Sequence, residues 1–146
     1  MNINVGHKFV SRIKWNPQNS EQMAYTWRQL LVYDLNDVLH PTEYMLVKDA
    51  PNKSRFQDLS FAPTTSLISS CYRNLVMIWD PRVGKMPVKS LFPEHEIMAC
   101  QFGKDDKTIF AVGEGGKVYG WDLHSYDLIR NHQYMSMSYY LHFINH

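Results

Sequence analysis

Three segments of the chain end in an aromatic residue followed by Asp, and their spacing restricts the fold more than any other feature. The segments LLVYDL, LVMIWD and KVYGWDL place these pairs at Tyr33-Asp34, Trp79-Asp80 and Trp121-Asp122. Successive pairs stand 46 and 42 residues apart. A period of a few tens of residues indicates repeated units that stack on one another, because a single unit cannot bury its apolar face alone. The chain is therefore expected to contain three related units.

Each unit consists of short segments with the composition of β-strands. The segments that open the units are VSRIKWNP, FQDLSFAP and IMACQFGK. A second segment follows each of them (EQMAYTW, SLISSCY and TIFAVG), and a fourth follows the turn after each Asp (TEYMLVK, MPVKSLF and YDLIRN). These segments are rich in Val, Ile, Leu, Tyr, Phe and Met, turn residues separate them, and no window keeps helical spacing. The glycines of GEGGK at 113–117 predict a tight hairpin.

These repeats resemble the WD-repeat (WD40) family, whose units of ~40–45 residues each form one four-stranded blade of a β-propeller. The resemblance implies an all-β fold with blades at residues 6–48, 52–92 and 94–133 and an irregular C-terminal tail at 134–146. Propellers have ~4–8 blades, so three blades form an open arc, a partial β-propeller. We expect a fragment or truncated form of a longer WD-repeat protein, or an arc that another copy or another chain completes. Open blade edges also allow self-association.

The family further implies a hydrogen-bonded set in each blade, formed by a His before the first strand, a Ser or Thr on the second, an Asp in the next turn and the Trp of the third. The set is incomplete in every unit here, since Tyr33 replaces the first Trp and Ala111 stands on the second strand of unit three. Each Trp is expected to pack between blades with its N–H paired inside its own blade. The positions that match the repeat pattern are His7, Tyr33, Asp34, Ser69, Trp79, Asp80, His95, Trp121 and Asp122.

Charge and cysteine usage exclude several classes of partner. The formal net charge is +1, from 15 Lys and Arg against 14 Asp and Glu that are interspersed, whereas nucleic-acid binders show a clustered basic face. Cys71 and Cys100 stand 29 positions apart, outside any metal-type spacing, and indicate a reducing compartment. No apolar run approaches the ~20 residues of a membrane span. We expect an intracellular, cytoplasmic protein with no integral membrane segment, with nuclear or endosomal association as alternatives.

The sequence also lacks the motifs of an enzyme. GEGGKVYG does not match a phosphate-binding loop, because Ala111 and Val118 stand where the Gly and the Ser or Thr are required. There is no GxSxG or HExxH, and the seven His residues never pair at metal-ligand spacing with a supporting carboxylate motif. Cys71 and Cys100 are interpreted as small buried hydrophobes. No catalytic activity, metal or cofactor is expected.

Three hypotheses for function follow from the resemblance. The first is an interaction scaffold that binds other proteins without chemistry. The second concerns Arg82, because Trp79-Asp80-Pro81-Arg82 matches the WDxR motif of WD-repeat substrate receptors of cullin-4 ubiquitin ligases, in which the Arg contacts the adaptor subunit. The longer motif expects an Asp in the preceding turn, where Tyr72, Arg73 and Asn74 stand. The third is a trafficking factor, since residues 102–125 are similar to a blade of endosomal Rab-effector WD-repeat proteins that regulate phosphoinositide-kinase complexes.

Overall fold

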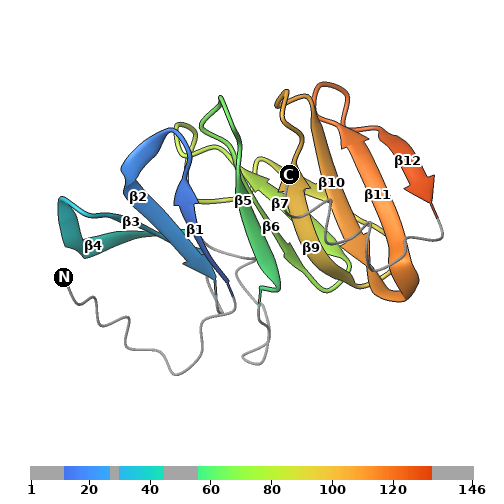
Figure 1. The fold of residues 1–146 in the computed structure, drawn as a ribbon, viewed down its shortest axis with the longest axis horizontal. Helices are drawn as coiled ribbons and strands as arrows, with labels where there is room; N and C mark the ends of the chain where they lie inside the picture. Colours follow the sequence, from blue (N-terminus) through green and yellow to red (C-terminus); the bar gives the residue numbers. More distant parts are fainter. Residues whose placement is uncertain (1–11, 27–29, 45–55, 133–146) are drawn as a thin grey trace.

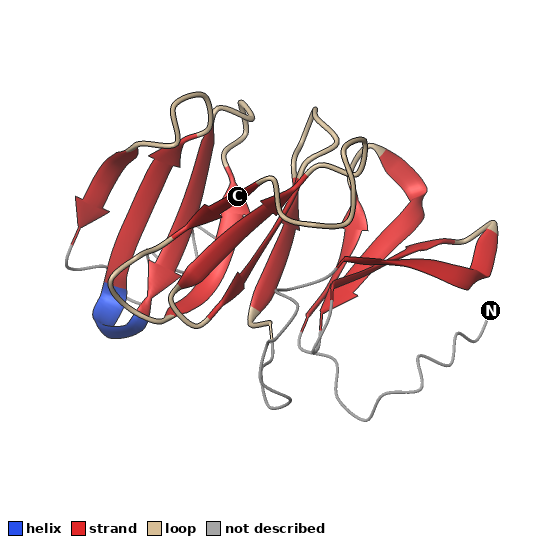
Figure 2. Ribbon diagram, turned by 180° about the vertical axis from the view of Figure 1, so that it is seen from behind, coloured by secondary structure: helices blue, strands red, loops and turns tan. Residues whose placement is uncertain are grey.

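The computed structural model describes residues 12–26, 30–44 and 56–132. These residues form three separate four-stranded antiparallel sheets, and the only helical segment among them is a 3-10 turn at Glu114–Gly116 (Figures 1 and 2). The prediction of an all-β fold with three four-stranded blades is confirmed. The described strands lie within the units predicted at 6–48, 52–92 and 94–133, and the predicted tail at 134–146 lies outside the described residues.

The strands follow one another along the chain within each sheet, so each blade is a meander. Blade 1 consists of β1 (Arg12–Asn16), β2 (Asn19–Thr26), β3 (Leu30–Asp34) and β4 (Asp37–Tyr44). Blade 2 consists of β5 (Asp58–Phe61), β6 (Ile68–Tyr72), β7 (Leu75–Trp79) and β8 (Lys89–Leu91). Blade 3 consists of β9 (Ile97–Phe102), β10 (Thr108–Gly113), β11 (Lys117–Asp122) and β12 (Leu128–His132).

The first strand of each blade lies against the neighbouring blade, and β9 contacts both β5 and β6. β1 packs on β5, and β5 packs on β9, while β4, β8 and β12 form the opposite edge of each sheet. Figure 1 shows the three sheets side by side in the order of the sequence, as successive blades of an open arc. The first strands are therefore the inner strands of the arc, and the fourth strands are the outer ones.

The alternation of side chains along each strand gives every blade two faces, which we name from their neighbours. The front face of a blade is turned toward the preceding blade, and the back face is turned toward the following blade. On the front of blade 2, cross-strand pairing aligns Phe61, Ile68 and Trp79 in one row. This row belongs to a buried cluster with three residues from the back of blade 1, which are Ala24, Leu30 and Val32.

The contact between blades 2 and 3 repeats this arrangement. Pairing on blade 3 aligns Phe102, Ile109 and Trp121 in a row at the equivalent register. They share a buried cluster with three residues of the back of blade 2, which are Cys71, Val76 and Ile78. Both cysteines, Cys71 and Cys100, are free and buried, so their interpretation as small hydrophobes is confirmed. Each aromatic residue of the repeat motif in blades 2 and 3 therefore packs against the blade before it.

Two local details refine the predicted strands. Gly115 and Gly116 have φ angles of 70° and 75°, so the turn between β10 and β11 depends on residues without a Cβ. The outer strand of blade 1 was expected at TEYMLVK, and this start is wrong because β4 already begins at Asp37. Pro41 lies inside β4. Proline has no backbone N–H, and an edge strand tolerates it because positions that face away from the sheet need no hydrogen bond to a neighbouring strand.

Candidate functional site

The Asp of each repeat forms the turn that leads to the outer strand. The carboxylates of Asp34, Asp80 and Asp122 accept a hydrogen bond from the backbone N–H two residues later, at 2.8, 3.0 and 2.8 Å. This contact is the side-chain counterpart of a tight turn, for which Asp is suited because it can accept from its own backbone. The N–H groups of Ser125 and His124 lower the pKa of Asp122. The Asp of the motif is thus a turn-forming residue in all three blades.

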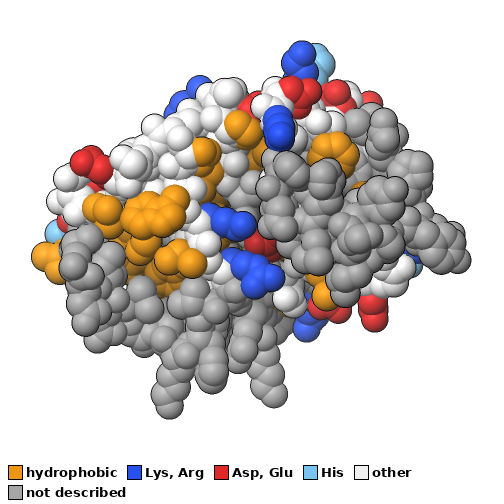
Figure 3. All heavy atoms as spheres, viewed as in Figure 1, with side chains coloured by type: hydrophobic (Ala, Val, Ile, Leu, Met, Phe, Trp, Pro, Cys, Tyr) orange, Lys and Arg blue, Asp and Glu red, His pale blue; other side chains and the backbone are white. Residues whose placement is uncertain are grey.

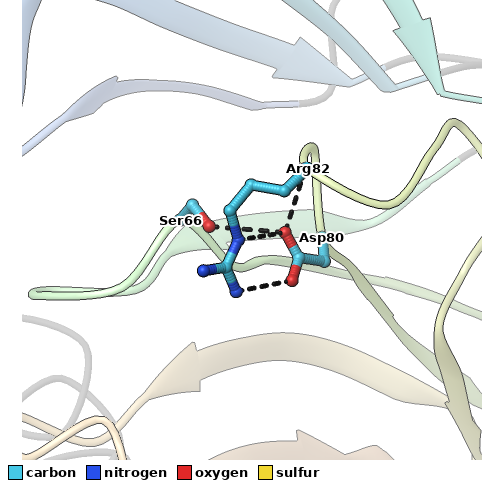
Figure 4. Close-up of polar contacts among 3 residues, drawn as sticks. All are labelled: Ser66, Asp80 and Arg82. Atoms are coloured by element: carbon cyan, nitrogen blue, oxygen red, sulfur yellow. Dashed lines mark hydrogen bonds and ion pairs between the residues drawn. The ribbon is translucent and has the colours of Figure 1, made fainter.

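Arg82 belongs to the turn after β7 and folds back on Asp80 (Figure 4). Its Nε lies 3.0 Å from Oδ1 of Asp80, and its Nη2 lies 2.7 Å from Oδ2. Ser66 donates a further hydrogen bond of 3.4 Å to the same carboxylate. The hydrogen bond from the Arg82 side chain is the main cause that lowers the pKa of Asp80. The Arg82 side chain is nevertheless 73% exposed, so its guanidinium is oriented by Asp80 and open to a partner.

A pocket of about 210 Å³ lies beside this turn, between blades 1 and 2. Pro81 lies between Asp80 and Arg82 in the sequence, and Ser66 donates a hydrogen bond to Asp80. Both residues line the pocket. Pockets for drug-sized molecules are usually ~300–1,000 Å³, so this one suits a single side chain better than a metabolite. The lining residues are Asn16, Gln22, Val32, Thr42, Phe61, Thr65, Ser66, Ile68 and Pro81.

Hydrogen bonds between loops connect neighbouring blades at the end of the sheets where Arg82 lies. The Nε2 of Gln18 donates to the carbonyls of Ala62 and Thr65 at 3.0 and 2.5 Å, which joins blade 1 to blade 2. The backbone N–H of Thr64 donates to Oδ2 of Asp106 at 2.7 Å, and the Thr64 hydroxyl donates to the same oxygen, which joins blade 2 to blade 3. Sequence reasoning missed these links, because polar loop residues give no signal of a distant partner. The rim that carries Arg82 is therefore held in place by its neighbours.

A second set of polar contacts joins the inner strands. Oδ2 of Asp58 accepts the backbone N–H of Cys100 at 3.2 Å, and the Nε of Arg12 lies 3.6 Å from Oδ1. The Ser60 hydroxyl accepts the N–H of Phe102 at 3.3 Å. Burial is the main cause that raises the pKa of Asp58. The alternation of polar and apolar residues in DLSF, in a strand that is otherwise buried, was the sequence signal for these contacts.

The raised pKa of Asp58 predicts a pH dependence of stability. Because the folded-state pKa lies above the unfolded value, this group favours folding below the unfolded pKa, and that contribution is lost as pH rises through the folded pKa. The variant Asp58→Asn keeps a carbonyl acceptor for the Cys100 N–H and has no charge to bury. The free energy of unfolding, measured by urea denaturation at several pH values, should fall relative to Asp58→Asn as pH rises from about 4 to 7. A constant difference between the two proteins across this range would contradict the prediction.

The structure does not assemble the hydrogen-bonded set of the family in blade 2. Trp79 is fully buried, but its Nε1 has no hydrogen-bond partner within the described part of the chain. Ser69 pairs with Ile78 in the sheet, so strand alternation turns it to the back face, away from Trp79. Its hydroxyl lies 3.7 Å from Sγ of Cys100 in blade 3. The prediction that the Trp79 N–H pairs inside its own blade is therefore wrong.

Blades 1 and 3 replace the expected set by aromatic contacts. Nδ1 of His95 lies 2.6 Å from the hydroxyl of Tyr119, whose ring stacks on Trp121 with centroids 5.6 Å apart. His95 thus holds Trp121 through Tyr119 and not directly. In blade 1, Tyr33 stacks on Tyr25 at 5.6 Å. His7 lies outside the described residues.

Neither a metal-binding cluster nor a membrane-spanning helix occurs in the described part of the chain. No group of three or more His, Cys, Asp or Glu residues that could hold a metal ion occurs in the described ranges. Of the helical segments described, none has the length and apolar character needed to cross a membrane. We take the rim around Asp80 and Arg82, with its adjoining pocket, as the candidate interaction site.

Part of the chain is similar to a known WD-repeat protein. The chain is 31% identical over 68 residues to the WD repeat-containing protein 91 homolog of Dictyostelium discoideum. The match covers 46% of this chain and 9% of that protein, so the chain spans less than a tenth of the length of its relative. No family model matches the chain. The match agrees with the three blades and supports a relation to WD-repeat proteins.

Proposed function

We propose that this chain is a non-catalytic protein-interaction scaffold of the WD-repeat type and a piece of a larger propeller. The three successive blades and the similarity to a WD-repeat protein support the scaffold. The observation that carries the proposal is Arg82, whose guanidinium is fixed by Asp80 and is 73% exposed at a rim that neighbouring loops hold in place. A preoriented, exposed Arg is a common anchor of protein interfaces.

The chemistry of this rim defines the partner that it suits. The pairing with Asp80 uses Nε and Nη2 of Arg82, so the rest of its planar fork can accept a carboxylate or stack on an aromatic ring. The adjoining pocket has room for one side chain of the partner. We expect an intracellular protein whose segment presents an acidic or aromatic residue to Arg82 and a second side chain to the pocket.

The proposal is tested by affinity purification of the tagged full chain from cells, with Arg82→Ala and Arg73→Ala as matched variants. Arg73 is exposed and lies in the turn between β6 and β7, at the other end of the blade. Proteins retained by the wild type and by Arg73→Ala, and lost with Arg82→Ala, support the proposal. Because Arg82 is exposed, thermal melts of Arg82→Ala should match the wild type. Equal recovery of every partner by all three proteins would contradict the role of Arg82.

A specific observation favours a ubiquitin-ligase adaptor as the partner. Trp79-Asp80-Pro81-Arg82 matches the WDxR motif, and in the structure the Asp orients the Arg at the surface. Arg73 occupies the preceding turn in place of the Asp of the longer motif, with a φ angle of 49°. Immunoblotting for the cullin-4 adaptor in the same purifications tests this candidate. Its absence from the wild-type sample would exclude the ligase and leave the scaffold to be judged by the other partners.

The trafficking hypothesis stays a prediction about the whole protein. The segment on which it rests, residues 102–125, includes the hairpin of β10 and β11 in blade 3. Fluorescence microscopy of the full-length protein should then show co-localisation with endosomal markers. A purely nuclear or diffuse pattern would count against trafficking.

A further inference from the structure

The turn after the repeated Asp differs between blade 2 and the other two blades. In blades 1 and 3 the residue after this Asp is Leu, and its N–H donates to a backbone carbonyl near the start of the second strand. Leu35 donates to Glu21 at 2.7 Å, and Leu123 donates to Lys107 at 2.8 Å. Blade 2 has Pro81 at this position. Because proline has no N–H, blade 2 cannot close its turn in the same way.

Blade 3 shows which side chains lie beside such a turn. Leu123 and Tyr126, from the turn after Asp122, pack against the buried cluster between blades 2 and 3. The Tyr126 ring centroid also lies 5.0 Å from Nζ of Lys89, on the outer strand of blade 2. Within the described residues, the turn after Asp80 adds no buried or partly buried apolar side chain to the cluster between blades 1 and 2. Blade 2 therefore lacks the apolar cover that blade 3 supplies.

The pocket of about 210 Å³ lies at the place of this missing cover. Its wall includes Val32 and Thr42, a cross-strand pair on the back of blade 1. The equivalent pair in blade 2 is Ile78 and Lys89, and there the apolar side chains of the blade 3 turn pack against the cluster and Lys89. The pocket thus has the position and the size of an apolar side chain that blade 2 does not provide.

The lining of the pocket favours an uncharged side chain. Three buried apolar residues line it, namely Val32, Phe61 and Ile68, and none of its lining residues carries a charge. A charged group would lose its hydration there without a partner, whereas an aliphatic group gains from the burial of its surface. Ser66 belongs to the pocket wall and also bonds Asp80, so the ion pair of Asp80 lies beside the pocket.

The charges near the pocket suit a carboxylate. Arg82 uses Nε and Nη2 for Asp80, and in Figure 4 the third guanidinium nitrogen points away from that carboxylate. Arg12 and Lys14 are exposed on β1, and Figure 3 shows Lys and Arg side chains on the surface where the first strands of blades 1 and 2 meet. These two cations exceed the single carboxylate of Asp58 beside them. The resulting positive field favours an anionic group on the partner.

We propose that this site binds a short partner segment in which a leucine-sized apolar side chain stands next to a carboxylate. The apolar side chain enters the pocket, as Leu123 packs at the contact of blades 2 and 3, and the carboxylate accepts hydrogen bonds from Arg82. The carboxylate comes from an acidic side chain or from the end of the partner chain, since both present the same group. This inference rests on the proposed function, because it names the partner chemistry of the same rim.

Two-dimensional NMR of the isotope-labelled full chain tests the site with defined probes. Acetyl-Leu-Asp-amide should produce saturable shifts at the backbone N–H groups of Ser66 and Ile68 and at Nε–H of Arg82. Acetyl-Leu-Asn-amide, without the charge, should bind about three- to five-fold more weakly, because an exposed ion pair contributes up to ~1 kcal/mol. Acetyl-Gly-Asp-amide, without the apolar side chain, should bind at least about tenfold more weakly. Acetyl-leucine represents a chain end, and the tighter of the two carboxylate probes identifies the source.

Pro81→Leu tests whether the pocket is the place of the missing side chain. It restores the N–H and the side chain that blade 3 has at this position, so acetyl-Leu-Asp-amide should bind at least about tenfold more weakly. The matched control is Pro87→Leu, the same exchange in the same loop outside the pocket lining, which should bind as the wild type does. If Pro81→Leu does not fold, Thr42→Phe at an exposed position of the pocket wall replaces it.

Three results would overturn the inference. These are the absence of saturable shifts at Ser66 and Arg82 with both carboxylate probes, binding of acetyl-Gly-Asp-amide or acetyl-Leu-Asn-amide equal to that of acetyl-Leu-Asp-amide, and unchanged binding by the pocket variant. Failure here is distinct from failure of the scaffold. Partners that are lost with Arg82→Ala in the purification uphold the proposed function even when no probe binds, and a binding probe without such partners refutes the proposed function alone.

Discussion

Replacing Trp79 by Ala should lower the free energy of unfolding by about 3–5 kcal/mol, the range for removal of a large buried ring. The indole is fully buried at the contact of blades 1 and 2, and its ring lies edge-on to Phe56 with centroids 6.0 Å apart. Trp79→Phe should cost clearly less than Trp79→Ala, because Nε1 of Trp79 makes no hydrogen bond within the described residues that the phenyl ring would lose. Urea denaturation followed by far-UV circular dichroism measures all three proteins.

The sizes of the stability losses for Trp79→Ala and Trp79→Phe test this interpretation. A loss below about 1 kcal/mol for Trp79→Ala would mean that the ring is not an inter-blade contact, because surface substitutions have effects of that size. A loss for Trp79→Phe as large as for Trp79→Ala would point to an N–H partner that stabilises the indole. The second outcome would restore the hydrogen-bonded set expected from the family.

Replacing Ile78 by Asp should prevent cooperative folding. Ile78 is fully buried in the cluster shared by the back of blade 2 and the front of blade 3. A carboxylate at this position would have to be desolvated without a partner, which costs more than about 4 kcal/mol and approaches the total stability of many domains. Thermal denaturation should show no cooperative transition for Ile78→Asp, or one displaced far below that of the wild type.

Two matched variants make this result specific to burial. Ile78→Val removes one methylene group and should cost about 0.5–1.5 kcal/mol. Met86→Asp introduces the same charge at an exposed position of blade 2 and should change stability by less than about 0.5 kcal/mol. A folded Ile78→Asp with near wild-type stability would show that blades 2 and 3 do not share a buried contact at this position.

The Trp-Asp segment shows which properties local sequence patterns predict and which they do not. Spacing and composition predicted that Trp79 ends a third strand and that Asp80 starts a turn, the family resemblance implied that Trp79 packs between blades, and the structure has all three. Strand alternation then decides the faces, since the register of β6 and β7 places Ser69 opposite Ile78 and turns it away from Trp79. The family pattern predicted that Ser69 and Trp79 belong to one hydrogen-bonded set, but it did not specify which residues of β6 and β7 lie opposite each other.

The polar links between blades were beyond the reach of sequence reasoning for a different reason. Asp58 with Cys100, Ser60 with Phe102, and Thr64 with Asp106 each join residues 42 positions apart, the same separation as Trp79 and Trp121. The polar residues of DLSF indicate that polar groups are buried in this strand, but local composition does not identify a partner one full repeat away. Asp58, Ser60, Thr64 and Asp106 considered alone are ordinary polar residues of a strand or turn, and Cys100 and Phe102 contribute only their backbone N–H.

The sequence by itself determined the three units, their strand composition and the turn-forming role of the repeated Asp, because these depend on backbone preferences and on side chains close along the chain. Only the tertiary structure decided that the motif aromatics of blades 2 and 3 face the preceding blade, that Asp80 holds Arg82 at the rim, and that Trp15 lies exposed on the equivalent face of blade 1. These properties depend on which surfaces meet when the blades stack. Burial is a property of that packing, and the local sequence does not specify it.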